Sequence, residues 1–136
     1  TDMSRWPTVK HFTSWLRLCP NNKITGGKVI QAGVLPTKNR ASVALRIAAS
    51  TLKTSDSALG AYYRRMHARL GPSAAITATA HKLARIIYFM LKHRKPFHDF
   101  GSDYYEQQFR ARVLRNLSRQ AAKFGYRLEQ TAISVS

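Results

Sequence analysis

Acidic residues and cysteine are both scarce in this chain. Its 136 residues contain six Asp plus Glu against 23 Lys plus Arg, and one cysteine. Six carboxylates are too few for us to expect two-carboxylate glycoside hydrolysis or a metal cage built from carboxylates alone. The one cysteine, Cys19, excludes an intramolecular disulfide and a multi-cysteine zinc site, and it favours a reducing, intracellular location.

Long apolar stretches are also missing. The most apolar segment, residues 74–91, carries His81, Lys82 and Arg85 and is amphipathic, so we do not expect it to span a membrane. No signal peptide is visible. Because 44% of the residues are apolar, the chain has enough of them to bury a core, and its length fits one domain over residues 1–136.

Positive charge is the dominant feature that is present. The formal net charge is +17 and the pI is near 11.0, with basic residues spread from Arg5 to Arg127. Such a charge indicates a polyanionic partner, and nucleic acid is the commonest. A membrane-surface protein gathers its basic residues on one amphipathic helix, so the spread disfavours that class. The remaining alternative is a very soluble domain whose charge has no partner.

The hydrophobic pattern predicts an all-α domain of about five helices packed around one core. A period of 3.6 residues places the helices at residues 9–18, 38–53, 58–70, 74–93 and 103–124. Prolines and glycines separate them. Glycines and β-branched side chains at residues 21–35 predict a loop or a short hairpin, and residues 133–136 are expected to be a frayed end.

The last predicted helix carries a basic stripe opposite an apolar one. The basic stripe consists of Arg112, Arg115, Arg119 and Lys123, and the apolar stripe of Val113, Leu117, Ala121 and Phe124. Along the helix, only Glu106 is near enough to pair with the stripe. One interpretation is a solvated helix face. The other is contact with a phosphate backbone, which would relieve the repulsion between the like charges.

The segment Lys23-Ile24-Thr25-Gly26-Gly27-Lys28 places a hydroxyl before two glycines, between lysines. Glycines allow a backbone to approach phosphate closely, and backbone amides and lysines bind its oxygens. We therefore predict that Thr25 binds a phosphate or attacks one. The segment is not a Walker loop, because the spacing of that motif is absent. The alternative is a Gly-Gly hairpin turn without chemistry.

Other polar clusters have simpler interpretations. His93, His98 and Asp99 are too few for the convergent ligand set of a metal site, and we predict no metal in this chain. Residues 62–65 interleave two tyrosines with two arginines, as nucleic-acid surfaces do, but helical spacing favours a core position for the tyrosines. Cys19 is expected to be a small core residue.

Several ordered blocks of the chain resemble the C-terminal domain of insertion-sequence transposases of the IS one-ten family. The blocks are residues 1–7, 12–16, 18–29, 38–41, 44–46, 48–49, 57–65 and 75–85. They fall within residues 1–96, whereas residues 97–136 form a basic C-terminal helix and tail. The resemblance implies that Thr1 cuts into a longer chain, so that this sequence is a fragment.

The resemblance implies a two-part recombinase guided by RNA. In that family a RuvC-like domain holds Mg²⁺ on four acids, a coiled coil follows, and a serine before Gly-Gly in the C-terminal domain attacks DNA phosphate. Thr25 stands at the position of that serine. Its additional methyl group stiffens χ1 and crowds an in-line attack.

We therefore expect a DNA-binding and strand-transfer domain of a transposase. Thr25 would be the nucleophile, and Mg²⁺ would belong to the missing domain. The partners would be DNA, a guide RNA and further copies of the full-length protein, in the prokaryotic cytoplasm at the nucleoid. Phosphate or DNA contacts are expected from Lys23, Gly26, Gly27, Lys28, Arg40 and Arg46, besides the basic stripe. The rival hypothesis is a non-catalytic RNA-binding or ribosomal-type basic protein.

The charge generates a first prediction. The chain should bind duplex DNA or structured RNA with little sequence preference, and the logarithm of its affinity should fall linearly with the logarithm of salt concentration. Each phosphate that a lysine or arginine neutralises releases a counterion, which makes binding salt-dependent. Titrating a labelled duplex at several salt concentrations measures the slope, and a flat plot would contradict the prediction.

Overall fold

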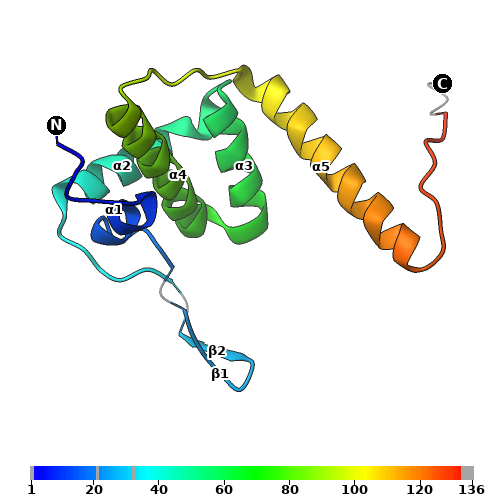
Figure 1. Cartoon of the computed structure of the whole chain (residues 1–136), viewed down its shortest axis with the longest axis horizontal. Helices are drawn as coiled ribbons and strands as arrows, with labels where there is room; N and C mark the ends of the chain where they lie inside the picture. The colour runs from blue at the N-terminus through cyan, green and yellow to red at the C-terminus, as the bar shows by residue number, and fades with distance from the viewer. Residues whose placement is uncertain (1, 21, 32, 133–136) are drawn as a thin grey trace.

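The computed structural model describes residues 2–20, 22–31 and 33–132, and the chain is mostly helical (Figure 1). The elements in these ranges are α1 (Val9–Trp15), β1 (Lys23–Thr25), β2 (Lys28–Gln31), α2 (Arg40–Ser50), the 3₁₀ helix η1 (Thr51–Thr54), α3 (Ala58–Leu70), α4 (Pro72–His93) and α5 (Gly101–Lys123). The all-α prediction is correct in outline, but β1 and β2 form a small antiparallel sheet. The predicted frayed end, residues 133–136, lies outside the described residues.

Helix α4 is the centre of the helical body, because it packs against α1, α2 and α3. Its buried side consists of Ala75, Thr79, Ala80, Ala84 and Tyr88. Four of these side chains are small, so neighbouring helix backbones can approach closely. No helix in the described part of the chain is both long and apolar enough to cross a bilayer.

Helix α1 is shorter than predicted and ends at Trp15 instead of residue 18. Arg17 adopts a left-handed backbone conformation with φ of 55°. This turn away from the helix allows Leu16 and Leu18 both to enter the core, where they are 0% and 1% exposed. At the other end, the Thr8 side chain caps the helix by accepting a hydrogen bond from the His11 amide.

The prediction that all the helices share one core is wrong for α5. It has no buried residue, and Leu117 and Phe124 of its apolar stripe are 46% and 80% exposed. Helix α5 begins beside α3, against which it packs, and then runs away from the other helices (Figure 1). Apolar periodicity shows that a helix has an apolar face but does not show that another element covers it.

The direction of α5 is set by contacts at the start of α3. The Asp99 carboxylate accepts hydrogen bonds from the amides of Ala58, at 3.0 Å, and Gly101, at 2.7 Å. The Ser102 amide donates to the Asp56 carbonyl at 2.9 Å. The first turns of α3 and α5 are thus joined through one carboxylate. The helix dipole also favours a negatively charged side chain at a helix N-terminus.

The close packing around α3 generates a stability prediction at Gly60. A Cβ at this buried position would lie 2.2 Å from the Ser55 carbonyl oxygen and 3.1 Å from that of Leu52. Replacing glycine by alanine inside a helix contributes ~0.5–1 kcal/mol of stability, but overpacking costs ~1–3 kcal/mol. We expect Gly60→Ala to lower the free energy of unfolding in urea, and Ser118→Ala on exposed α5 to leave it nearly unchanged. A Gly60→Ala variant as stable as the parent would contradict the packing described here.

Candidate nucleic-acid interface

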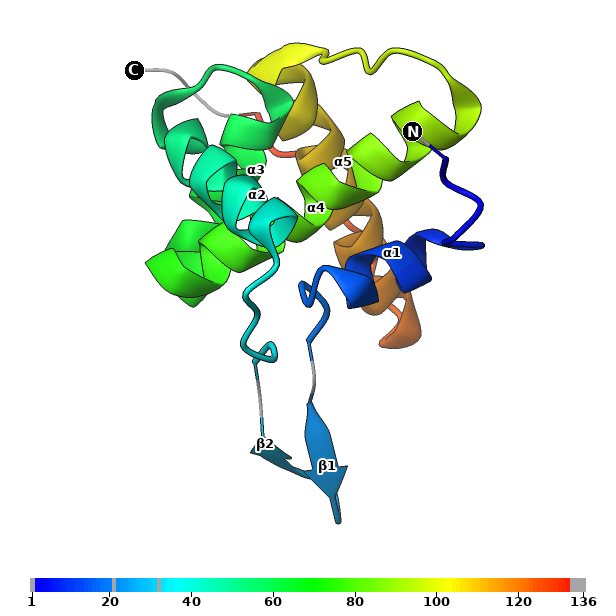
Figure 2. The same ribbon diagram turned by 90° about the vertical axis from the view of Figure 1, so that its left-hand side faces the viewer.

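The residues predicted to carry chemistry lie on a hairpin that projects from the helical body. Figure 1 and Figure 2 show β1 and β2 standing away from the helices in two perpendicular views. Gly26 and Gly27 have φ values of 56° and 77°, which are the positive angles of a two-residue type I′ turn. At the base of the hairpin, the Gly33 amide donates to the Asn22 side chain at 3.3 Å. The predicted short hairpin is therefore confirmed.

The strand pairing places Thr25 beside a lysine. Thr25 is paired with Lys28, and Ile24 with Val29. Paired residues of an antiparallel ladder point to the same face, so the hydroxyl and the Lys28 ammonium share one face and the two apolar side chains share the other. Residues 22–30 are all exposed. The turn is open, since a Cβ on either glycine would meet nothing within 4 Å. This face can present a hydroxyl and positive charge to a phosphate.

Of the two arginines predicted to steady this loop, Arg46 contacts another element. Its Nη1 donates to the Thr77 hydroxyl at 2.9 Å and so connects α2 with α4. Arg40 lies exposed in the first turn of α2, after the chain has returned from the hairpin to the helical body. The contact of Arg46 stabilises the packing that carries the hairpin, rather than the hairpin itself.

The basic stripe lies along α5 and is exposed. Arg112, Arg115, Arg119 and Lys123 all face solvent. Glu106, the acid nearest to the stripe on α5 itself, is instead ion-paired with Arg65 of α3. Within the described residues this is the one ion pair, so the stripe has no carboxylate partner there. A row of unpaired cations on a projecting helix suits contact with a polyanion.

The segment of two tyrosines and two arginines in α3, residues 62–65, contributes mainly to holding the fold together. Tyr63 is buried. Arg64 donates to the carbonyl oxygens of Lys53 and Ser55. The Arg65 guanidinium lies 3.4 Å from the centre of the Phe109 ring, in addition to its ion pair with Glu106. These contacts fasten α3 to the preceding η1 and to α5.

A second basic site, which sequence patterns did not indicate, is a cavity of about 370 Å³ on α3 and α4. It is lined by Tyr62, His81, Lys82, Arg85, Ile86 and Phe89, and we call it the basic cleft. Lys82 and Arg85 are three residues apart on one helix. That spacing alone does not show that Tyr62 of α3 and the charges of α5 lie next to them.

Like charges crowd Lys82 in this cleft. Its Nζ lies 4.3 Å from the centre of the Tyr62 ring and 5.9 Å from that of Tyr105 on α5. Burial, followed by the charges of Arg112 and Arg85, lowers the pKa of Lys82. Burial and then Arg85 likewise lower the pKa of His81, which favours its neutral imidazole. An anion in the cleft would relieve the repulsion.

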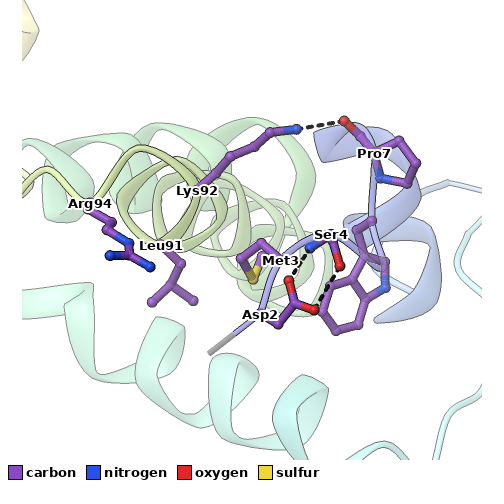
Figure 3. A pocket seen from close by; sticks show the side chains of 8 residues that line it. Asp2, Met3, Ser4, Pro7, Leu91, Lys92 and Arg94 are labelled. Carbon is purple, nitrogen blue, oxygen red and sulfur yellow. Dashed lines mark hydrogen bonds between the residues drawn. The ribbon is translucent and has the colours of Figure 1, made fainter.

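A larger cavity, of about 630 Å³, lies between the N-terminal segment and the end of α4 (Figure 3). Three of its polar side chains, those of Asp2, Ser4 and Lys92, make local contacts. Lys92 donates to the Pro7 carbonyl at 2.7 Å, and Ser4 donates to the Asp2 carboxylate. The backbone amide and then the hydroxyl of Ser4 lower the pKa of Asp2. This cavity marks where the N-terminal segment is fastened to α4.

The polar side chains of the described residues do not form a metal site. No three His, Cys, Asp or Glu side chains among them gather closely enough to hold a metal ion. Cys19 is half-buried, and its Sγ lies 3.1 Å from the Thr13 hydroxyl oxygen and 3.8 Å from His81 Nε2.

Compared with known proteins, the chain matches no protein family, no curated sequence and no solved structure. The resemblance to insertion-sequence transposases therefore stays a prediction.

The exposed stripe generates a prediction about nucleic-acid binding. Changing Arg115, Arg119 and Lys123 together to Gln should make the salt dependence of duplex binding shallower, because fewer counterions are released. The helical circular dichroism signal should not change, since all three side chains are exposed. The matched control changes Arg5, Lys10 and Lys53, which are exposed elsewhere, to Gln. Equal slopes for the two triple variants would show that only the total charge matters and not its place on α5.

Proposed function

We propose that this chain is the DNA-binding and strand-transfer domain of an insertion-sequence transposase of the IS one-ten type. The observation that carries the proposal is the Thr25 hydroxyl, exposed on a projecting hairpin, where it is paired with Lys28 across the Gly26-Gly27 turn. Support comes from the order of the sequence blocks that resemble this family and from the net charge of +17. The proposal places the protein in the prokaryotic cytoplasm, at the nucleoid.

The proposed chemistry is attack by the Thr25 Oγ1 on a DNA phosphorus. A bond forms between Oγ1 and phosphorus while a phosphorus–oxygen bond to a sugar breaks, which leaves the strand joined to the protein until it is transferred. Lys28, on the same face of the hairpin, would stabilise the negative charge that develops on the phosphate oxygens. Lys23, two residues before Thr25 on β1, would do the same.

The hairpin does not contain everything that this reaction needs. Residues 20–40 include no Asp, Glu or His that would take the proton from Thr25. The acids in the described residues do not gather into a set that would fit Mg²⁺. In this proposal the RuvC-like domain of the full-length protein supplies the proton acceptor. Alone, the chain should bind DNA without cutting it.

The helical body and α5 would hold the DNA for this attack. The lysines of the hairpin and the basic stripe of α5 are exposed, and the hairpin and α5 project from different parts of the body (Figure 1). Such an arrangement suits contacts with phosphates at several points of a long duplex or of a structured guide RNA. Assembly of several copies through the full-length protein belongs to the same proposal.

A second candidate is a non-catalytic basic nucleic-acid-binding protein of the RNA-binding or ribosomal type. The observation that favours it is the exposed hairpin itself, with Ile24 and Val29 on one face and Lys28 on the other. Two-stranded ribbons of this kind enter nucleic-acid grooves without any chemistry. In that case Thr25 would contribute no more than a hydrogen bond to a phosphate.

The nucleophile is tested by fusing the chain behind a complete RuvC-like domain and coiled coil. We expect weak recombination of paired DNA substrates with Thr25, more with Thr25→Ser, and none with Thr25→Ala. The methyl group of threonine crowds the attack, and alanine lacks the attacking oxygen. The measurement is the amount of recombined product with guide RNA present.

Two results would decide against the catalytic role. Recombination by Thr25→Ala at the parent rate would mean that Thr25 is not the nucleophile. A variant outside the hairpin, Arg40→Gln in the first turn of α2, separates loss of chemistry from loss of DNA binding, because it keeps Thr25 and both hairpin lysines and removes one exposed charge. If Thr25→Ala and Arg40→Gln weaken DNA binding equally and no variant forms product, the non-catalytic candidate is favoured.

A further inference from the structure

The basic cleft lies next to an apolar hollow, and Phe89 and Ile86 line both. The hollow has a volume of about 490 Å³, and its other lining residues include Met90, His93 and Phe97. The apolar aromatic side chain of Phe89 is 43% exposed to solvent. A charged cavity and an apolar one thus share a wall formed by an exposed aromatic ring.

The charged side of this pair is built for an anion. The Lys82 ammonium lies 4.3 Å from the centre of the Tyr62 ring and 5.9 Å from that of Tyr105, Arg85 lines the same cleft, and the positive charge of Arg112 on α5 also acts on Lys82. No carboxylate of the described residues forms an ion pair with any of these three side chains. Crowded cations are costly unless an anion is bound between them. A phosphate group, with its several acceptor oxygens, fits both the charge and the donors.

The apolar side has the features of a stacking platform. The ring of Phe89 is parallel to the imidazole of His93, with an interplanar angle of 6° and a centroid distance of 5.9 Å. Proteins that bind single strands stack unpaired bases on such aromatic groups, whereas the bases of a duplex are stacked on each other and unavailable. The cavity volumes lie in the range of pockets for small ligands, which is about 300–1,000 Å³, and are far too small for a duplex.

We propose that the basic cleft and the hollow beside it bind one nucleotide of a single-stranded nucleic acid, with its phosphate on Lys82 and Arg85 and its base against Phe89. This inference rests on the proposed function only in that nucleic acid is the partner of the chain. It adds a site on α4, separate from the hairpin, that distinguishes single strands from duplexes.

The phosphate half of the proposal is tested with labelled oligonucleotides of one sequence, as a single strand and as a duplex, measured by fluorescence anisotropy. Lys82→Met keeps the packing between the two tyrosines, and Arg85→Gln changes an exposed side chain. Each should weaken single-strand binding by about tenfold and duplex binding by less than about twofold, as expected when one charge-assisted phosphate contact is lost. The matched control, Arg110→Gln on exposed α5, should lower both affinities equally and slightly.

The base half is tested with Phe89→Leu, which keeps an apolar side chain but removes the ring. It should weaken single-strand binding by about tenfold, within the range for stacking of one base, and should not change the binding of an abasic single strand. Phe124→Leu, at an 80% exposed position directly after the end of α5, is the control and should change neither. Equal losses on normal and abasic strands would overturn the stacking role.

The outcomes separate this inference from the proposed function. If all cleft variants bind single strands as the parent does, or lose single-strand and duplex affinity in equal measure, the nucleotide site is refuted while nucleic-acid binding stands. If the parent binds neither probe at low salt, the proposed function fails first. A second measurement is the acetylation of Lys82, which the single strand should slow and the duplex should not.

Discussion

The structure depends on the close approach of α4 to the helices around it. Ala75, Ala80 and Ala84 are fully buried and have very small side chains, so α4 can lie close against three other helices. The larger Tyr88 lies further along the same side and donates its hydroxyl to the Trp6 carbonyl at 2.9 Å. Because α4 is fixed in this way, its other side is free to carry Lys82, Arg85 and Phe89. The packing face and the proposed nucleotide site thus lie on one helix.

The contacts of the carboxylates determine which cations of the chain remain without a partner. Glu106 is used by Arg65, Asp99 binds the amides that begin α3 and α5, and Asp2 binds Ser4. These acids are therefore occupied in maintaining local structure and leave the cations of α5 and the basic cleft uncompensated. Because the chain has six acids, the groups that these acids bind decide which positively charged surfaces remain available to a partner.

Local patterns in the sequence predicted more of the fold than of the site. The Gly26-Gly27 pair predicted the hairpin because glycine adopts the two positive φ angles of such a turn without steric cost. The helices were predicted to within a few residues, except where Arg17 leaves α1 early. The exposure of α5 was missed, since it depends on contacts of Asp99 with a helix 41 residues earlier in sequence. The basic cleft was missed for the same reason: Lys82 meets Tyr62 and Tyr105 only after three helices have packed.

Residues 22–30 of the hairpin add no buried side chain to the core, and the hairpin is attached to the body through loops at both ends. Substitutions at its tip therefore have little effect on whether the chain folds, apart from the two glycines that the turn requires. A serine and a threonine at position 25 are equally acceptable to the folded state, and only the reaction distinguishes them. Evolution is free to gain, weaken or lose an activity at this tip while the helical body and its affinity for polyanions persist.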